Sequence, residues 1–351
     1  MTGNCVMTSR ERALATYAFQ KTDIPCFDLM EGTIWDSLRQ GFQEKYNLID
    51  NEEIQQALGS DFRWTIFRSE YPIQGAPPDD GMGGGNYSDD LGLRLLRNVQ
   101  SPGEVREILK LDPTLVEVPN FKEFRKNNPD KALICCPGWM PAFSGACRHF
   151  GMITAMSLMS ERPEVIESYV KVQAEYALEI IRRCLRAEAH KYCDFLWLGD
   201  DFSGESSMLI SPSMWRALFK DALRIQVQEA RDAGLLVMFH SCGDVAAVYE
   251  DFIEIGINAH IGVQTSCSDM SAELLSFTIG GRLVIHGGVD AQTTLVSGSF
   301  EDVVRATQMN IRAFKRCGGY VVSNSHHSLD DIDAEKIVAM SVGAGRWKRA
   351  P

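Results

Sequence analysis

The feature of this sequence that most constrains its fold is a regular alternation of short apolar runs with longer segments of helical periodicity from residue 130 onward. This alternation is typical of βαβ units, whose strands lie parallel in one sheet. Most of the runs are continuously apolar, as expected for strands that are covered on both faces. We predict strands at 132–136, 195–198, 235–239, 259–263, 283–286 and 320–323, with an earlier candidate at 24–29.

The segments around these runs carry the end signals of helices. Ser211 and Arg162 each precede a proline, which is favoured in the first helical turn because its missing N–H needs no partner there. Gly234, Gly256 and Gly318 follow three of the segments, where a left-handed residue commonly ends a helix. We predict helices at 9–19, 102–110, 163–187, 212–232, 245–255, 272–277, 300–316 and 333–341.

Six or seven strand-helix repeats in 351 residues favour a closed (β/α)8 barrel over the alternative, an open doubly wound sheet. We therefore predict an α/β fold in which residues 1–351 form a single barrel domain, with an N-terminal helical segment at about 1–22 and loop insertions at the C-terminal face. The stretch 76–90 is too rich in Gly and Pro for a regular element, so we predict a flexible loop there, which could act as a lid.

The net charge of −12 makes nucleic-acid binding an improbable function, because such a surface needs a clustered excess of Lys and Arg. No stretch approaches 18 consecutive apolar residues, and the N-terminus lacks the apolar core of a signal peptide. We expect a cytoplasmic protein without membrane spans. In that compartment the ten cysteines are expected to be reduced thiols.

Polar residues follow nearly every predicted strand, and in a barrel the ends of all strands meet at one face. Such a convergence predicts a functional site at the C-terminal face. The polar segments are Gly199 to Glu205, His240 to Asp244, Gln264 to Cys267, His286 to Asp290 and Ser323 to His327.

His240 and Cys242 lie two residues apart at the end of a predicted strand, so their side chains point the same way. Zinc accepts such nitrogen and sulfur ligands, and a catalytic zinc site has three protein ligands and one open position. The structural alternative is that His240 caps the strand and Cys242 is a buried thiol. For the third ligand, His326 is the first choice and Cys267 the second, while Asp200, Asp201 or Glu205 could supply an oxygen.

Beside a metal, an aspartate can orient a ligand histidine or act as a general base, which makes Asp200, Asp201 and Asp290 candidate catalytic residues. For the Asp200–Asp201 pair, the structural alternative is a helix cap and a solvated turn. His286 lies inside its strand and is expected to be a core histidine. The candidate substrate-binding residues are Trp139, Phe202, Gln264 and Asn324, and ordinary core packing is the alternative for the aromatic ones.

With these strand ends in place, the chain resembles the uroporphyrinogen decarboxylase superfamily over most of its length. The resemblance implies a (β/α)8 barrel. It rests on short segments in a characteristic order, namely 8–15 with 23–25, 199–201 followed by 209–212, 239–244, 287–290, and 318–320 leading to 325–326.

The resemblance also implies a chemistry. Porphyrinogen decarboxylases of the superfamily carry an arginine-rich segment soon after the first strand, whereas residues 27–33 contain no arginine. The zinc-dependent methyltransferases of the same superfamily use a His-x-Cys pair after the fifth strand and a cysteine after the last strand. His240 and Cys242 match the pair, and His326 stands at the approximate position of the final cysteine.

The resemblance thus implies a methyltransferase that moves a methyl group between a small methylated donor or acceptor and the cobalamin of a separate corrinoid protein. The histidine in third place favours an O-methyl donor, such as a methoxylated aromatic, and hence O-demethylation. One alternative is a metal-free decarboxylase or lyase of a small acid that uses Asp200, Asp201 and His326. A second is a non-catalytic corrinoid- or small-molecule-binding module, and a homodimer is left open.

Overall fold

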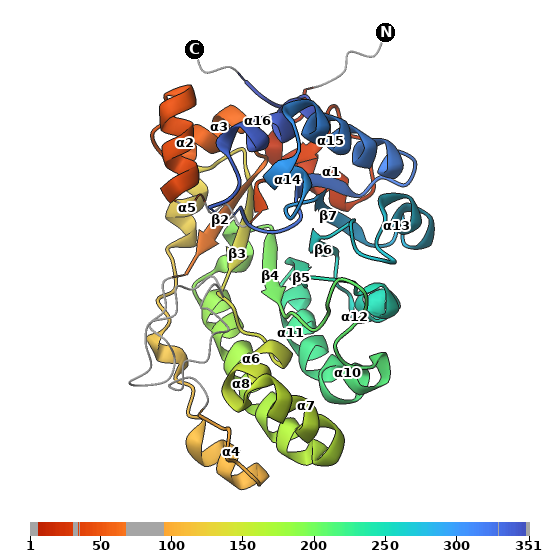
Figure 1. Cartoon of the computed structure of the whole chain (residues 1–351). Helices are drawn as coiled ribbons and strands as arrows, with labels where there is room; N and C mark the ends of the chain where they lie inside the picture. Colours follow the sequence, from red (N-terminus) through yellow and green to blue (C-terminus); the bar gives the residue numbers. More distant parts are fainter. Residues whose placement is uncertain (1–5, 31–33, 35, 68–94, 329, 349–351) are drawn as a thin grey trace.

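A computed structural model describes residues 6–30, 34, 36–67, 95–328 and 330–348. It confirms the predicted (β/α)8 barrel: eight parallel strands form one nearly closed sheet, surrounded by helices (Figure 1). Along the sheet the strand order is β1-β8-β7-β6-β5-β4-β3-β2, so consecutive strands are neighbours from β2 to β8. The strands are β1 (Cys26–Phe27), β2 (Phe62–Ile66), β3 (Ala132–Cys136), β4 (Phe195–Gly199), β5 (Leu236–His240), β6 (Ala259–Val263), β7 (Val284–Val289) and β8 (Tyr320–Asn324).

The helices cover the outside of the barrel and connect its strands. In chain order they are α1 (Ser9–Tyr17), α2 (Asp36–Tyr46), α3 (Asn51–Leu58), α4 (Pro102–Ile108), η2 (Pro113–Leu115), α5 (Phe121–Asn127), α6 (Phe143–Phe150), α7 (Met152–Glu161), α8 (Pro163–Arg186), α9 (Ala189–Tyr192), α10 (Pro212–Leu218), α11 (Lys220–Asp232), η3 (Ala246–Val248), α12 (Tyr249–Ile255), α13 (Ala272–Thr278), α14 (Thr294–Ser297), α15 (Phe300–Phe314) and α16 (Ala334–Gly343).

Two of the differences from the predicted elements have a clear physical cause. The helix expected at 212–232 is two helices, because the backbone of Phe219 leaves the helical region at φ −120° and ψ −31°. Strand β2 was not predicted, because Arg63 interrupts its apolar pattern. The Arg63 side chain is nevertheless buried, since it bonds Glu52 of α3 at 2.7 Å.

The core has two layers. Alternate residues of each strand point into the barrel, as Phe195 and Trp197 do on β4, while Leu196 and Leu198 pack against the helices outside. Tyr17 of α1 packs on the Phe195 ring at 4.6 Å and belongs to the inner layer. The inside of the barrel is therefore filled with side chains below its C-terminal face.

The barrel closes between β1 and β2 through Asp61 rather than through a strand ladder. The Asp61 N–H donates to the Phe27 carbonyl at 2.8 Å, and its carboxylate accepts from the Phe27 N–H at 3.0 Å. Arg12 and Arg346 each bond the same fully buried carboxylate at 2.7 Å. The side chain and backbone of one residue, Asp61, thus join the two edges of the sheet.

The predicted loop at 76–90 lies outside the described residues. Among the helices that are described, none combines the length and the apolar character that a membrane span requires. The nine cysteines within the described ranges are free thiols.

Candidate metal centre

Asp201, His240 and Cys242 come together at the C-terminal ends of β4 and β5. These strands are neighbours, and their register places Gly199 beside His240. His240 Nε2 lies 3.4 Å from Cys242 Sγ and 3.4 Å from Asp201 Oδ1. All three ligand atoms lie within 4.8 Å of one another, so two adjacent strand ends deliver one nitrogen, one sulfur and one oxygen to the same point.

This spacing fits a metal ion. Two ligand atoms on a tetrahedral zinc with bonds of about 2.0 to 2.3 Å are roughly 3.3 to 3.8 Å apart. The two distances from His240 Nε2 match that separation. Three protein ligands also leave one coordination position open, as catalytic zinc sites do.

The electrostatic environment of the three side chains favours a cation. Burial alone would lower the pKa of His240, but the adjacent Cys242 and Asp201 outweigh it and hold that pKa well above its usual value. For Asp201 the signs are opposite. Burial alone would raise its pKa, but the hydrogen bond with His240 outweighs burial and leaves the pKa below its usual value. The site therefore stabilises positive charge at the point where the three ligand atoms converge.

Backbone hydrogen bonds fix the segment that carries the ligands. The Cys242 N–H donates to Asp201 Oδ1 at 2.7 Å, and the Gly243 N–H donates to the side-chain oxygen of Gln264. Gly243 has φ +81°, and a Cβ on it would lie 2.5 Å from the Gly204 carbonyl oxygen. Only glycine fits this approach of the two loops.

The two predicted third ligands, His326 and Cys267, lie outside this group of three, whereas Asp201, one of the oxygen alternatives, lies within it. His326 Nδ1 is 3.1 Å from the His327 carbonyl oxygen. Burial, followed by the charge of Glu205, raises the pKa of Cys267 to about 11. Coordination by either residue stays a prediction.

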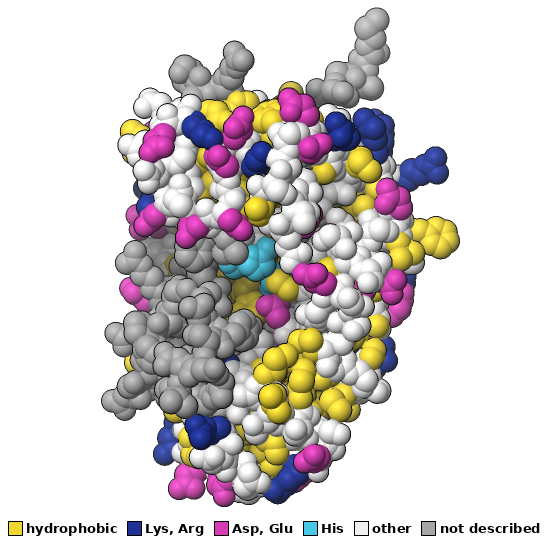
Figure 2. Space-filling model, viewed as in Figure 1, with side chains coloured by type: hydrophobic (Ala, Val, Ile, Leu, Met, Phe, Trp, Pro, Cys, Tyr) yellow, Lys and Arg dark blue, Asp and Glu magenta, His cyan; other side chains and the backbone are white. Residues whose placement is uncertain are grey.

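A cavity of about 360 Å³ opens beside the group, and Figure 2 shows histidine side chains at a hollow of this surface. Glu205 from the β4 end, Cys242 from the β5 end and Gln264 from the β6 end line it together with His326 and His327. The cavity is of the size that small-molecule sites have.

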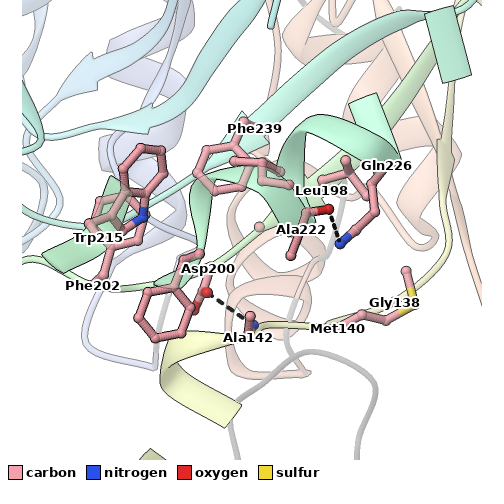
Figure 3. Close-up of a pocket in the computed structure, with 13 residues that line it drawn as sticks. Gly138, Met140, Ala142, Leu198, Asp200, Phe202, Trp215, Ala222, Gln226 and Phe239 are labelled. Carbon is pink, nitrogen blue, oxygen red and sulfur yellow. Dashed lines mark hydrogen bonds between the residues drawn. The ribbon is translucent and has the colours of Figure 1, made fainter. Parts of the chain in front are cut away.

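Asp200 and Asp290 cap helices instead of facing the group. Asp200 accepts hydrogen bonds from the N–H groups of Ala142, Phe143 and Ser144 at the start of α6, and Figure 3 shows the first of these. Burial raises the pKa of Asp200 to about 6 against the opposing effect of these bonds. Asp290 caps α14 through the N–H groups of Thr293 and Thr294.

The four candidate substrate-binding residues divide between the site and the core. The Trp139 ring lies 5.7 Å from the His240 ring, and Gln264 lines the cavity. Phe202 is fully buried in the outer layer against Trp215, at 5.4 Å. Asn324 is also fully buried and accepts the Met30 N–H at 3.0 Å.

A second cavity, drawn in Figure 3, lies behind β4 and β5. Phe202, Trp215 and Asp200 line it, and its volume of about 30 Å³ has room for about one water molecule. It is too small for a substrate.

Sequence reasoning missed two neighbours of the ligands. Gly262 has φ +76° at a register shift in β6, and a Cβ on it would lie 2.7 Å from His240 Nδ1. A glycine inside a strand is the available signal for such a close approach. His260 contacts the backbone carbonyl of Ser241, between the two predicted ligands. The sequence signal for this contact is a polar residue within the apolar run of a predicted strand.

Comparisons with known proteins agree with this architecture. The structure is similar to a methyltransferase from Methanosarcina mazei, with a TM-score of 0.64, 15% sequence identity and coverage of 97% of this chain and 98% of that one. A D-psicose 3-epimerase matches with a TM-score of only 0.36 and 11% identity over 69% of this chain and 86% of that one, too weak a likeness to carry an argument. No curated protein matches the sequence.

The family comparison covers the part of the chain that carries the site. The sequence pattern of the family described as uroporphyrinogen decarboxylase (URO-D) matches residues 143–344, more than half of the chain. This range includes strands β4 to β8 and all three residues of the candidate metal centre. The chain therefore belongs to the uroporphyrinogen decarboxylase family.

Proposed function

We propose that this chain is a zinc-dependent methyltransferase, which moves a methyl group between a small substrate and the cobalamin of a separate corrinoid protein. The observation that carries the proposal is the convergence of Asp201, His240 and Cys242 beside an open cavity. Family membership and the likeness in fold to the Methanosarcina methyltransferase, which extends over nearly all of both chains, support it.

In this proposal the three side chains hold the metal, and the cavity holds the substrate. A bound zinc supplies Lewis acidity to the atom that bears or accepts the methyl group. His240 and Cys242 are fixed by β5 and the segment after it, and Asp201 approaches from β4. In this proposal the corrinoid protein docks at the C-terminal face, where the cavity opens.

The charge around the cavity favours an uncharged substrate. None of the described residues that line it is Arg or Lys, and Glu205, held by Gln292 at 2.7 Å, adds a carboxylate. The segments that follow β3 to β8 at this face also contain no Lys or Arg, but they contain Asp200, Asp201, Glu205, Asp244, Asp269, Asp290, Asp330, Asp331 and Asp333.

A polycarboxylate such as a porphyrinogen would meet like charge here and no described cationic partner. An O-methyl donor such as a methoxylated aromatic carries no charge and avoids this repulsion, and the aromatic ring of Trp139 lies beside His240. We favour that donor class.

The test combines metal analysis with two substitutions. We expect about one zinc per chain in the purified protein, and loss of most of that zinc in the His240→Ala and Cys242→Ala proteins. Methyl transfer from methoxylated aromatics to cob(I)alamin should fall by at least about a hundredfold in both, as expected when a metal ligand is lost. His190→Ala and Cys317→Ala, which alter the same residue types away from the site, should keep zinc and activity.

Substoichiometric zinc in the wild-type protein, or full activity in the two ligand variants, would exclude the metal mechanism. Release of CO₂ from a small acid by metal-free protein would instead favour the decarboxylase alternative within the family.

A further inference from the structure

A buried histidine supports the segment that carries the metal ligands. His260 is fully buried on β6, and its side chain points away from the barrel interior, because its neighbours Ala259 and Ile261 face inward. Its Nε2 lies 2.9 Å from the carbonyl oxygen of Ser241, and its Nδ1 lies 2.8 Å from the hydroxyl of Tyr249, the first residue of α12.

These contacts, together with the burial of the ring, select one protonation state of His260. A carbonyl oxygen only accepts hydrogen bonds, so His260 Nε2 must carry the hydrogen and donate it to Ser241. His260 Nδ1 then accepts the hydrogen of the Tyr249 hydroxyl. Burial lowers the pKa of His260 to about 3, which keeps the ring neutral, and burial raises the pKa of Tyr249, which keeps its hydroxyl protonated.

The acceptor of this chain of hydrogen bonds lies between the two predicted ligands. Ser241 separates His240 from Cys242, and its carbonyl points toward β6. Asp201 accepts the N–H of the same peptide group, that of Cys242. Both polar groups of the Ser241–Cys242 peptide therefore have fixed partners, and His260 connects this peptide through Tyr249 to α12.

We propose that His260, oriented by Tyr249, is a positioning residue that holds the Ser241 carbonyl so that His240 and Cys242 converge on one metal ion. The inference rests on the metal site of the proposed function. It predicts that metal affinity depends on an N–H donor at position 260, although His260 itself does not bind the metal.

The experiment measures metal affinity without turnover. Co²⁺ is titrated into metal-free protein, and the charge-transfer absorbance of the Cys242 thiolate bound to Co²⁺ reports binding, with Zn²⁺ competition giving the zinc affinity. His260→Leu should bind on the order of ten- to a hundredfold more weakly, as outer-sphere substitutions at metal sites do. His260→Gln retains an N–H donor and should recover most of the affinity. Tyr249→Phe should give a smaller loss, because it frees the ring to change tautomer.

The chain offers a matched control in a second buried pair. His149 Nδ1 lies 3.0 Å from the Tyr169 hydroxyl, between α6 and α8. His149→Leu and Tyr169→Phe should lower the melting temperature, as is also expected of the His260 and Tyr249 variants, but should leave metal affinity unchanged.

The outcomes separate the inference from the proposed function. Wild-type protein that binds no metal would overturn both. Wild-type protein that binds metal, together with folded His260→Leu of equal affinity, would overturn the inference alone. If His260→Leu does not fold, Tyr249→Phe decides: a folded Tyr249→Phe protein with the Co²⁺ affinity of the wild type contradicts the inference.

Discussion

Two glycines determine how closely the backbone approaches the predicted metal ligands. Gly243 lies against the Gly204 carbonyl, and Gly262 lies against the imidazole of His240. Both have positive φ, so a side chain at either position would be strained as well as crowded. The shape of the site therefore depends on residues that carry no chemistry themselves.

Gly262→Ala provides a test at this scale. The new Cβ would lie 2.7 Å from His240 Nδ1 and should push the ring away from Cys242, so we expect Co²⁺ affinity to fall at least about tenfold. Gly234→Ala is the control, because Gly234 has φ +90° with no atom within 4 Å of a Cβ. It should cost about 1 kcal/mol of stability from backbone strain alone and leave the affinity unchanged. Equal affinities in the two variants would show that the contact with His240 does not matter.

At the residue scale, the sequence predicted the pairing of His240 with Cys242, because two residues on a strand end share a direction. The sequence could not show which of the two adjacent aspartates places its carboxylate oxygen beside His240. Asp200 and Asp201 are adjacent in sequence, and only the path of the chain after Gly199 turns Asp200 toward α6 and Asp201 toward His240.

Elements were predictable where one physical signal dominated. Continuous apolar runs predicted β3 to β8, because both faces of each strand are covered. Strand β2 was missed because its buried Arg63 depends on Glu52, a partner that the local pattern does not contain. Helix α1 depends on the same kind of long-range pairing, since Arg12 bonds Asp23 and Asp61.

Arg12→Ala should therefore loosen α1 and destabilise the barrel. Its guanidinium is almost fully buried, and its removal leaves Arg346 as the ion-pair partner of the Asp61 carboxylate among the described residues. Breaking a buried pair costs about 3 to 5 kcal/mol, and we expect the lower end because Arg346 remains. Urea unfolding measures the change. Arg39→Ala removes an exposed pair with Asp36 and should change stability by less than about 1 kcal/mol. A similar loss in both variants would contradict the role of Arg12.

At the scale of the whole molecule, ion pairs around Asp61 close the barrel. The edges at β1 and β2 meet through Asp61, and the cations that hold Asp61 come from α1 and from Arg346 after the last helix. Both ends of the described chain thus meet at one carboxylate. The stability of the fold should depend on the ionisation of the surrounding acids.

Acid titration tests this dependence. The hydrogen bond from Arg12 lowers the pKa of Asp23 to about 2, against an ordinary value of 3.8. A depressed pKa in the folded state contributes stability above the unfolded value, and this contribution disappears as the pH falls from about 4 to 2. We expect a loss of about 1 to 2 kcal/mol from this group after allowance for solvent screening. Asp23→Asn should be less stable at pH 6 and show a smaller decline below pH 4. An unchanged decline would assign the acid sensitivity to other carboxylates.

The three predicted ligands come from the ends of two neighbouring strands, within a stretch of sequence from Asp201 to Cys242. The ends of β6, β7 and β8 form other parts of the cavity without supplying any of the three. Under the proposed function, metal binding and substrate recognition therefore depend largely on different strand ends. Exchange of the loops after β7 and β8 should then change which substrate is accepted, provided that Gln264 after β6, which holds the ligand segment, is kept.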